Sequence, residues 1–267
     1  MQVYIDGIGL FGPGLPGWNN SQGALTGHAA YDKDAIPDLS GEFLPPTERR
    51  RAGKSVKLAL EVAHEAIAQT GISAQEAATI FASSGGDAEV IHQICETLAS
   101  ADRMISPMRF HNSVHNAAAG YWSIATGSRQ PSSSLSCCND TFSAGLLEAV
   151  SQALAEQTPV LLVAYDLPHP EPMHSMRSIC AAFGCAMLIS PSRSAATLAQ
   201  LNISIVQQDK TPLSVMRHAP ELEILRTCNP AARALPLLQV FAENIPAFIV
   251  FKHIGNSQLH VECTPCR

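Results

Sequence analysis

Residues 132–150, SSSLSCCNDTFSAGLLEAV, join a run of small side chains to two adjacent cysteines, a turn-forming Asn-Asp pair and a long apolar segment. The small residues predict a strand over 132–138, and the apolar spacing that follows predicts a helix over 141–156. Enzymes often place a nucleophile on such a strand-to-helix corner, since the side chain is exposed there beside the positive end of the helix. Either cysteine is therefore a candidate thiol nucleophile.

The segments on both sides of this corner alternate between strand and helix patterns. The all-apolar run 159–165 is typical of a strand that is buried on both faces of a sheet. The alternation predicts an α/β fold in which helices pack on a mixed β-sheet. Further strands are expected at 3–8, 79–83, 183–190 and 201–206, helices at 47–71, 86–98, 117–125 and 230–243, and a terminal hairpin at 247–263.

The composition is that of a globular protein with a low density of surface charge, with 46% hydrophobic and 15% charged residues. Such a surface is often covered by a partner chain. A net charge of −6 argues against nucleic-acid binding. No apolar run reaches the roughly 18 residues of a membrane span and no secretory signal is evident, so we expect a cytoplasmic protein. The eight cysteines are scattered, which predicts free thiols rather than a disulfide framework.

Two short motifs suggest ligands that we do not expect. Gly7-Ile-Gly9-Leu-Phe-Gly12 matches a dinucleotide fingerprint, but that site needs a helix directly after the last glycine, and Pro13 and Pro16 follow instead. We expect no cofactor. Cys263 and Cys266 have the spacing of half a zinc site. No second pair accompanies them, so we interpret them as frayed free thiols, with a metal module that includes nearby histidines as a minor alternative.

Several segments, in this order, resemble the β-ketoacyl synthases of the thiolase superfamily. A closer match is the short synthase-like subunit called a chain-length factor, of the aryl-polyene type, because the segment NPAARALPLLQVFA (229–242) also fits. The segments that carry the family resemblance are YIDGIGLFGPG (4–14), ERRRAGKSVKLALEVAHEAIAQTGI (48–72), SSGGDAEVIHQI (83–94), FHNSVHNAAAGYWSIATGSRQPSSSLS (110–136), VLLVAYD (160–166) and AAFGCAMLIS (181–190).

This resemblance implies a thiolase-like layered fold with its first half retained and its second half truncated. One domain is then expected over 1–267, with 191–267 as a shortened C-terminal portion. The resemblance also implies an active β-ketoacyl synthase as partner in a heterodimer, which would form through the strand at 132–138. An acyl carrier protein would be reached through that partner, in polyene or fatty-acid-type biosynthesis. A homodimer is the alternative for the isolated chain.

The departures from the family concern its catalytic residues. Active members need a corner cysteine and two histidines, which resemble His-Gly-Thr and Gly-His contexts, whereas this sequence has no His-Gly dipeptide. An ungapped alignment places Asn139 at the nucleophile position, and a shift of one residue places Cys138 there. We interpret the corner as degenerate, with no catalytic residue expected and activity absent in the isolated chain. The alternative is a stand-alone thiol acyltransferase that uses Cys138 with His111 or His115 as base.

His218, His253 and His260 are interpreted as ordinary surface or strand histidines. The basic cluster at 49–57 predicts a solvated helix face, with docking of an acidic carrier protein as the alternative. We expect five residues to line the acyl tunnel or the subunit interface: Tyr121, Trp122, Cys138, Asn139 and Phe142.

Overall fold

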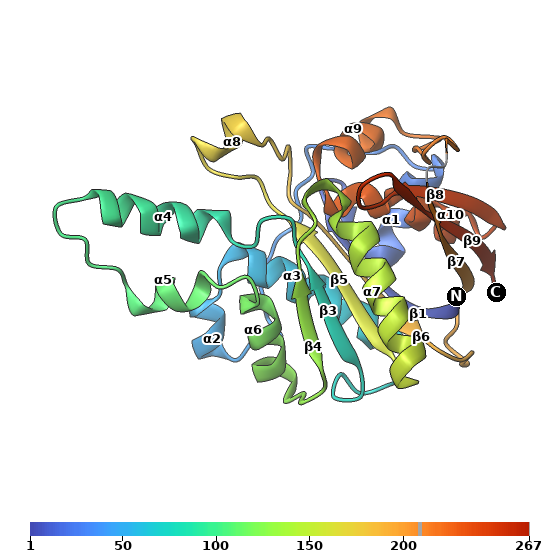
Figure 1. Ribbon diagram of the computed structural model, residues 1–267, viewed down its shortest axis with the longest axis horizontal. Coiled ribbons are helices and arrows are strands. Elements are labelled where there is room, and N and C mark those ends of the chain that lie inside the picture. Colours follow the sequence, from blue (N-terminus) through green and yellow to red (C-terminus); the bar gives the residue numbers. More distant parts are fainter. Residues whose placement is uncertain (208–209, 267) are drawn as a thin grey trace.

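The computed structural model describes residues 1–207 and 210–266, and its strands form one mixed sheet (Figure 1). Along the sheet the strands follow the order β4-β3-β5-β6-β1-β7-β9-β8, with the short β2 paired to β1. The strands are β1 (Gln2–Gly12), β2 (Leu15–Pro16), β3 (Ala78–Ala82), β4 (Ser132–Leu135), β5 (Val160–Asp166), β6 (Phe183–Ser190), β7 (Ala199–Gln207), β8 (Ala247–Lys252) and β9 (Ser257–Pro265).

The direction of the strands divides the sheet into a parallel and an antiparallel part. β3 runs parallel to both β4 and β5, whereas all pairs from β5 through β6, β1, β7 and β9 to β8 are antiparallel. β7, β8 and β9 follow Ser190 in the chain and continue the same sheet beyond β1. The described strands therefore end at two edges, β4 on one side and β8 on the other.

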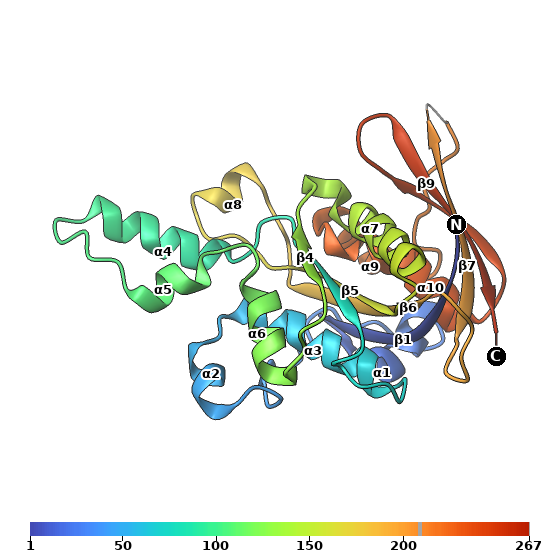
Figure 2. The same cartoon turned by 60° about the horizontal axis from the view of Figure 1, so that its bottom comes forward.

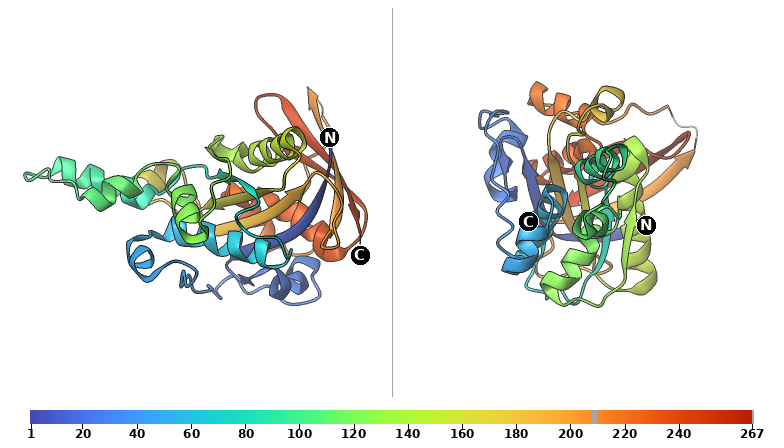
Figure 3. Two further views of the ribbon diagram at one scale, coloured as in Figure 1. Left: turned by 90° about the horizontal axis from the view of Figure 1, so that it is seen from below. Right: turned by 90° about the vertical axis from the view of Figure 1, so that its left-hand side faces the viewer.

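Helices cover both faces of the sheet (Figure 2, Figure 3). On β5, Val160, Leu162 and Ala164 pack into the core that includes α7, whereas the alternate residues pack into the core that includes α3. This explains why the strand is apolar throughout. The helices are α1 (Trp18–Thr26), α2 (Pro46–Arg51), α3 (Lys54–Ala68), α4 (Ala88–Ala99), α5 (Pro107–Asn112), α6 (Ala117–Thr126), α7 (Thr141–Glu156), α8 (Met173–Met176), α9 (Pro220–Cys228) and α10 (Leu235–Glu243), with the 3-10 turns η1 (Cys138–Asp140) and η2 (Ala231–Ala234).

The glycines of the dinucleotide-like motif lie inside β1, where they allow α3 to approach closely. A Cβ atom added to Gly7 would lie 2.1 Å from the Ala66 carbonyl oxygen, and one added to Gly9 would lie 1.9 Å from that of Val62. As expected from the prolines, no helix follows Gly12 directly, because β2 intervenes before α1. The motif is a requirement of strand–helix packing.

α4 and α5 form an arm that projects from the body of the molecule (Figure 1, Figure 3). Large apolar side chains are exposed along this arm and on the neighbouring α6. They are Ile91, Leu98, Met104, Phe110, Val114 and Ile124. In the described part of the chain, no helix combines the length and the apolar character that crossing a membrane requires.

Several predicted boundaries were wrong. The strand expected over 132–138 ends at Leu135, because η1 begins at Cys138. The helical pattern from Thr47 is two helices, α2 and α3, since the backbone leaves the helical region at Ala52 and Gly53. The helix expected over 230–243 begins as the 3-10 turn η2. The predicted bounds of α7 are confirmed, but Leu147 and Leu154 are only half-buried, so one side of this helix is partly open.

The cysteines also differ from the expectation of free thiols throughout. Cys180 and Cys228 form a disulfide, with Cα atoms 5.7 Å apart. The two residues are 48 positions apart in sequence. The fold brings the stretch before β6 next to the end of α9, which the spacing of the cysteines does not indicate. Cys263 is not frayed either, because it is buried in β9 and belongs to the core. Among the described residues, no group of three or more metal-ligating side chains is assembled.

Candidate functional site

The corner between β4 and α7 has a strained backbone at Cys138. This residue has a φ of 51°, in the left-handed region that few residues other than glycine adopt. The Thr141 hydroxyl stabilises the turn, because it accepts a hydrogen bond from the Cys137 amide (3.0 Å) and donates one to the Cys138 carbonyl (2.7 Å). The strained position of the corner is thus Cys138, and Asn139 follows it.

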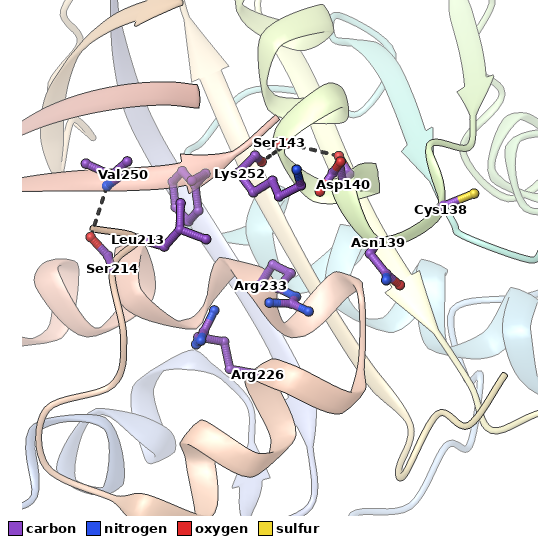
Figure 4. A pocket seen from close by; sticks show the side chains of 11 residues that line it. Cys138, Asn139, Asp140, Ser143, Leu213, Ser214, Arg226, Arg233, Val250 and Lys252 are labelled. Carbon is purple, nitrogen blue, oxygen red and sulfur yellow. Dashed lines mark hydrogen bonds between the residues drawn. The ribbon is translucent and has the colours of Figure 1, made fainter. Parts of the chain in front are cut away.

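A cavity of about 300 Å³ opens beside the corner (Figure 4). Both Cys138 and Asn139 are exposed and line it. The Cys138 side chain points away from Arg226 and Arg233, which lie on the other side of the cavity (Figure 4). The remaining lining residues come from η1, from α7, from 213–214 and from β8: Asp140, Ser143, Leu213, Ser214, Val250, Phe251 and Lys252.

The charge beside the Cys137 thiol is negative. Burial raises the pKa of Cys137, and the nearby Asp140 carboxylate raises it further. A reactive cysteine usually lies in an electropositive environment, since the thiolate is the nucleophile. The surroundings of Cys137 therefore favour the thiol over the thiolate.

His253 was wrongly interpreted as an ordinary surface or strand histidine. Only 6% of it is exposed, and it lies behind the first turn of α7. Its Nδ1 is 3.2 Å from the Ser143 hydroxyl, which also donates to the Lys252 carbonyl at 2.8 Å. Burial lowers the pKa of His253, although the charge of Asp140 opposes this effect. Its only sequence signal was its place directly after the apolar run AFIVFK of the hairpin.

His218 and His260, also in the C-terminal portion, lie elsewhere. His218 Nε2 is 3.2 Å from a carboxylate oxygen of Glu243. His260, on β9, packs its ring edge-to-face on Phe248, with centroids 5.1 Å apart. Both contacts are those of ordinary surface or strand residues.

The histidines considered as bases for Cys138 make other contacts. His115 Nε2 is 3.0 Å from the Ser83 carbonyl oxygen and donates a hydrogen bond to it. The His111 ring packs edge-to-face on Tyr121, with centroids 6.1 Å apart. These contacts orient both rings for packing and give no support for a base at the corner.

Sequence reasoning missed a buried polar cluster at the carboxyl ends of β3 and β5. Asp166 is 2% exposed, and its Oδ1 accepts hydrogen bonds from the Ser84 amide (2.8 Å), the Ser84 hydroxyl (2.7 Å) and the Ser83 hydroxyl (3.2 Å). Burial raises the Asp166 pKa to about 6. Ser136 and Arg177 both donate to the Ser84 carbonyl at 3.1 Å. The cluster thereby joins the loops that follow β3, β4 and β5.

Comparison with known proteins identifies the family. The family model described as "Beta-ketoacyl synthase, N-terminal domain" matches residues 18–237. The chain belongs to this β-ketoacyl synthase family. No curated protein matches the chain.

Solved structures share the ketosynthase fold. One is described as the ketosynthase ApeO in complex with its chain length factor ApeC from Xenorhabdus doucetiae, with a TM-score of 0.70, 21% identity, and coverage of 98% of this chain and 99% of that one. The ishigamide ketosynthase/chain length factor has a TM-score of 0.75 at 13% identity, with both chains fully covered. A β-ketoacyl synthase from Burkholderia phymatum STM815 has a TM-score of 0.71 at 11% identity, also with full coverage of both chains. The thiolase-like layering of helices on a mixed sheet is therefore confirmed.

Within this ketosynthase fold, the five residues expected at the tunnel or interface do not form one site. Cys138 and Asn139 line the cavity, and Phe142 is buried directly behind it against Phe251. Tyr121 and Trp122 are buried in the core on the α3 side of the sheet, whereas Phe142 belongs to the core on the α7 side.

Proposed function

We propose that this β-ketoacyl synthase family member is a non-catalytic subunit of the chain-length-factor type, which pairs with an active ketosynthase in polyene or fatty-acid-type biosynthesis. The edge position of β4 carries this proposal, because among the described strands the one that leads into the corner has a neighbour on one side only. An exposed strand edge is a template for pairing with a strand of another chain. In the proposed heterodimer the partner supplies catalysis and receives the acyl carrier protein.

The free edge of β4 can be assigned to particular residues. The carbonyl oxygens of Pro131 and Leu135 accept hydrogen bonds from Thr79 and Ser83, so these positions face β3. Because alternate residues of a strand direct their backbone groups to opposite sides, Ser132 and Ser134 present theirs at the free edge. Their small side chains allow a second strand to approach.

The neighbouring surface is unusually apolar for a free face. Phe110 on α5 is 65% exposed and Ile124 on α6 is 53% exposed. α6 packs beside β4, so a partner that added a strand to β4 would also cover part of this surface. Large apolar side chains exposed on α5 and α6 favour a protein interface.

The comparisons support pairing, since the two solved structures with chain length factors are complexes with a ketosynthase. The negative charge of Asp140, which disfavours the Cys137 thiolate, argues against this cysteine as a nucleophile. In this proposal residues 1–267 act as one domain, of which 191–267 is a shortened C-terminal portion. Cys138 and Asn139, with Phe142 behind them, border the space for the growing acyl chain, and Tyr121 and Trp122 support the interface from the core.

Coexpression with an active ketosynthase of an aryl-polyene pathway, followed by size exclusion, tests the pairing. We expect one heterodimer peak. Ser134→Pro removes an edge N–H and places the proline ring in the path of an added strand, so it should abolish the complex but leave the chain folded. Ser134→Ala keeps the N–H and should pair normally. A chain that elutes only as a homodimer beside the ketosynthase, or full pairing of Ser134→Pro, would contradict the proposal.

One observation favours the second candidate function, a thiol acyltransferase. Cys138 is exposed in the left-handed corner conformation, which resembles the strained turn of a nucleophile elbow. Acylation of the isolated chain at Cys138 distinguishes the two functions.

A further inference from the structure

The cavity beside the corner contains more positive than negative charge. Three cationic side chains line it, namely Arg226, Arg233 and Lys252, and they come from α9, η2 and β8. Asp140 faces them from the corner, and Glu223 binds Arg226 from the same helix. The cations therefore outnumber the carboxylates of this group by one.

Arg226 is held rigidly at the base of the cavity. It is only 8% exposed, and Glu223 accepts two hydrogen bonds from it, from Nε at 2.7 Å and from one terminal nitrogen at 2.5 Å. Glu223 also accepts the Met216 amide at 3.0 Å, which fixes the carboxylate in turn. Because the guanidinium group is already fixed, binding of a ligand to its remaining face would cost little side-chain entropy.

In the described part of the chain, the guanidinium group of Arg233 makes fewer hydrogen bonds than that of Arg226. Its Nε is buried and has no hydrogen-bond partner among the described residues, and one terminal nitrogen donates to the Thr227 carbonyl at 3.3 Å. Burial and the nearby charge of Arg226 lower the Arg233 pKa, which means that the folded chain holds two like charges close together at a cost. In Figure 4 both side chains point toward the open space below Asp140 and Lys252.

The remaining walls define the shape of a ligand. Leu213, Val250 and Phe251 form an apolar side. The N-terminus of the 16-residue helix α7 adjoins this side through Ser143, which also lines the cavity. Helix N-termini favour negative charge, which adds to the effect of the arginines. A water molecule takes up about 30 Å³ of liquid, so a cavity of about 300 Å³ has room for an oxyanion and several attached carbon atoms.

We propose that this cavity is a binding site for a compact oxyanion, a carboxylate or a phosphate group, carried on a short apolar arm. Arg233 and Arg226 bind the oxyanion, Lys252 closes the site from β8, and Leu213 and Phe251 contact the arm. Because Cys138 and Asn139 line the same cavity, this site deepens the proposed function by naming a charged group that the space beside the corner accepts. Binding is measured on the isolated chain, so it can fail or succeed independently of pairing with a ketosynthase.

Isothermal titration calorimetry on the isolated chain tests this site with two probes, sodium malonate for a carboxylate and sodium phosphate for a phosphate group. Both are compared with sodium chloride at equal ionic strength. We expect saturable binding of at least one probe with a Kd of about 1 mM or lower. The tighter of the two identifies the head group. Because hydrogen bonds to charged groups are strong, Arg233→Met should weaken binding by about tenfold or more.

Two further variants make the result specific. Arg193→Met removes an exposed arginine from the stretch after β6, and it should bind the probe as the original chain does. Lys252→Met changes an exposed side chain that donates only to the Gly255 carbonyl among the described contacts, so it should fold and bind more weakly even if Arg233→Met is unstable. Absence of saturable binding for both probes, or unchanged affinity in Lys252→Met and in folded Arg233→Met, would overturn the proposal.

Discussion

The ring of Phe142, in the first turn of α7, meets the ring of Phe251 on β8 edge-to-face, with 5.3 Å between the centroids. Phe142 is fully buried, and Phe251 lines the cavity at the corner. The aromatic pair joins the helix that follows the corner to the C-terminal hairpin. It therefore forms the wall behind the space that the proposed function assigns to an acyl chain.

Removal of the Phe142 ring should change the product of the reconstituted pair. Phe142→Ala opens space next to the cavity, so we expect longer or more varied acyl products with turnover retained, as measured by mass spectrometry of the products. The truncation should also lower the free energy of unfolding by about 3–5 kcal/mol. Leu146→Ala, one turn later and equally buried, controls for this loss. An identical product distribution in both variants would show that Phe142 does not limit the chain.

The exposed apolar surface of the arm should contribute to pairing. Phe110→Ser removes a ring that is 65% exposed, so the stability of the isolated chain should change by less than about 0.5 kcal/mol. If a partner covers this ring, the Kd of the complex should rise by about tenfold. Ile224→Ser changes an equally exposed apolar residue on α9 and should leave the Kd unchanged. Equal effects of the two substitutions on the Kd would contradict a role for the arm.

The isolated chain should be chemically inactive. Incubated with acyl-carrier-protein thioesters it should retain no acyl group, and it should not decarboxylate a malonyl-carrier-protein thioester. The reason is that the two histidines considered as bases for Cys138, His111 and His115, make other contacts in the described part of the chain. Intact-protein mass spectrometry measures both outcomes. Stoichiometric acylation that disappears in Cys138→Ala would support the acyltransferase function instead.

Local patterns predicted much of the fold. The apolar run of β5 and the helical spacing of α7 identified the centre of the sheet and its main helix, because both elements bury residues at a regular period. The pattern of α2 and α3 was misread as one helix, since apolar spacing does not detect a short break at Gly53. The 3-10 turn η1 was also missed, because its conformation depends on the Thr141 hydroxyl that binds across the turn.

The candidate site was harder to predict, since its residues come from distant parts of the chain. The strand-to-helix corner at Cys138 and Asn139 could be located from 132–150 alone. Arg226 and Arg233 reach it because η2, which follows α9, packs on α7 and β6, and His253 reaches the first turn of α7 from the end of β8. The Asp166 cluster depends likewise on three loops that meet at the ends of parallel strands, which no single segment reveals.

The buried carboxyl group of Asp166 should make stability depend on pH in an unusual direction. Burial raises its pKa from 3.8 to about 6, so the folded state holds a proton that the unfolded state releases between these values. Stability is therefore expected to fall as the pH rises from about 4 to about 6, by at most about 3 kcal/mol from this group.

Asp166→Asn keeps an oxygen acceptor for Ser84 and cannot ionise. Burial also lowers the pKa of the neighbouring His169, which makes a second contribution to the pH dependence. The contribution of the carboxyl group is therefore the difference in free energy of unfolding between the original chain and Asp166→Asn. Urea unfolding at several pH values should show the stability of the original chain declining relative to Asp166→Asn over this range, whereas the exposed Asp102→Asn should follow the original chain. Parallel profiles for the original chain and Asp166→Asn would mean that the Ser83 and Ser84 hydrogen bonds already hold the carboxylate in its charged form.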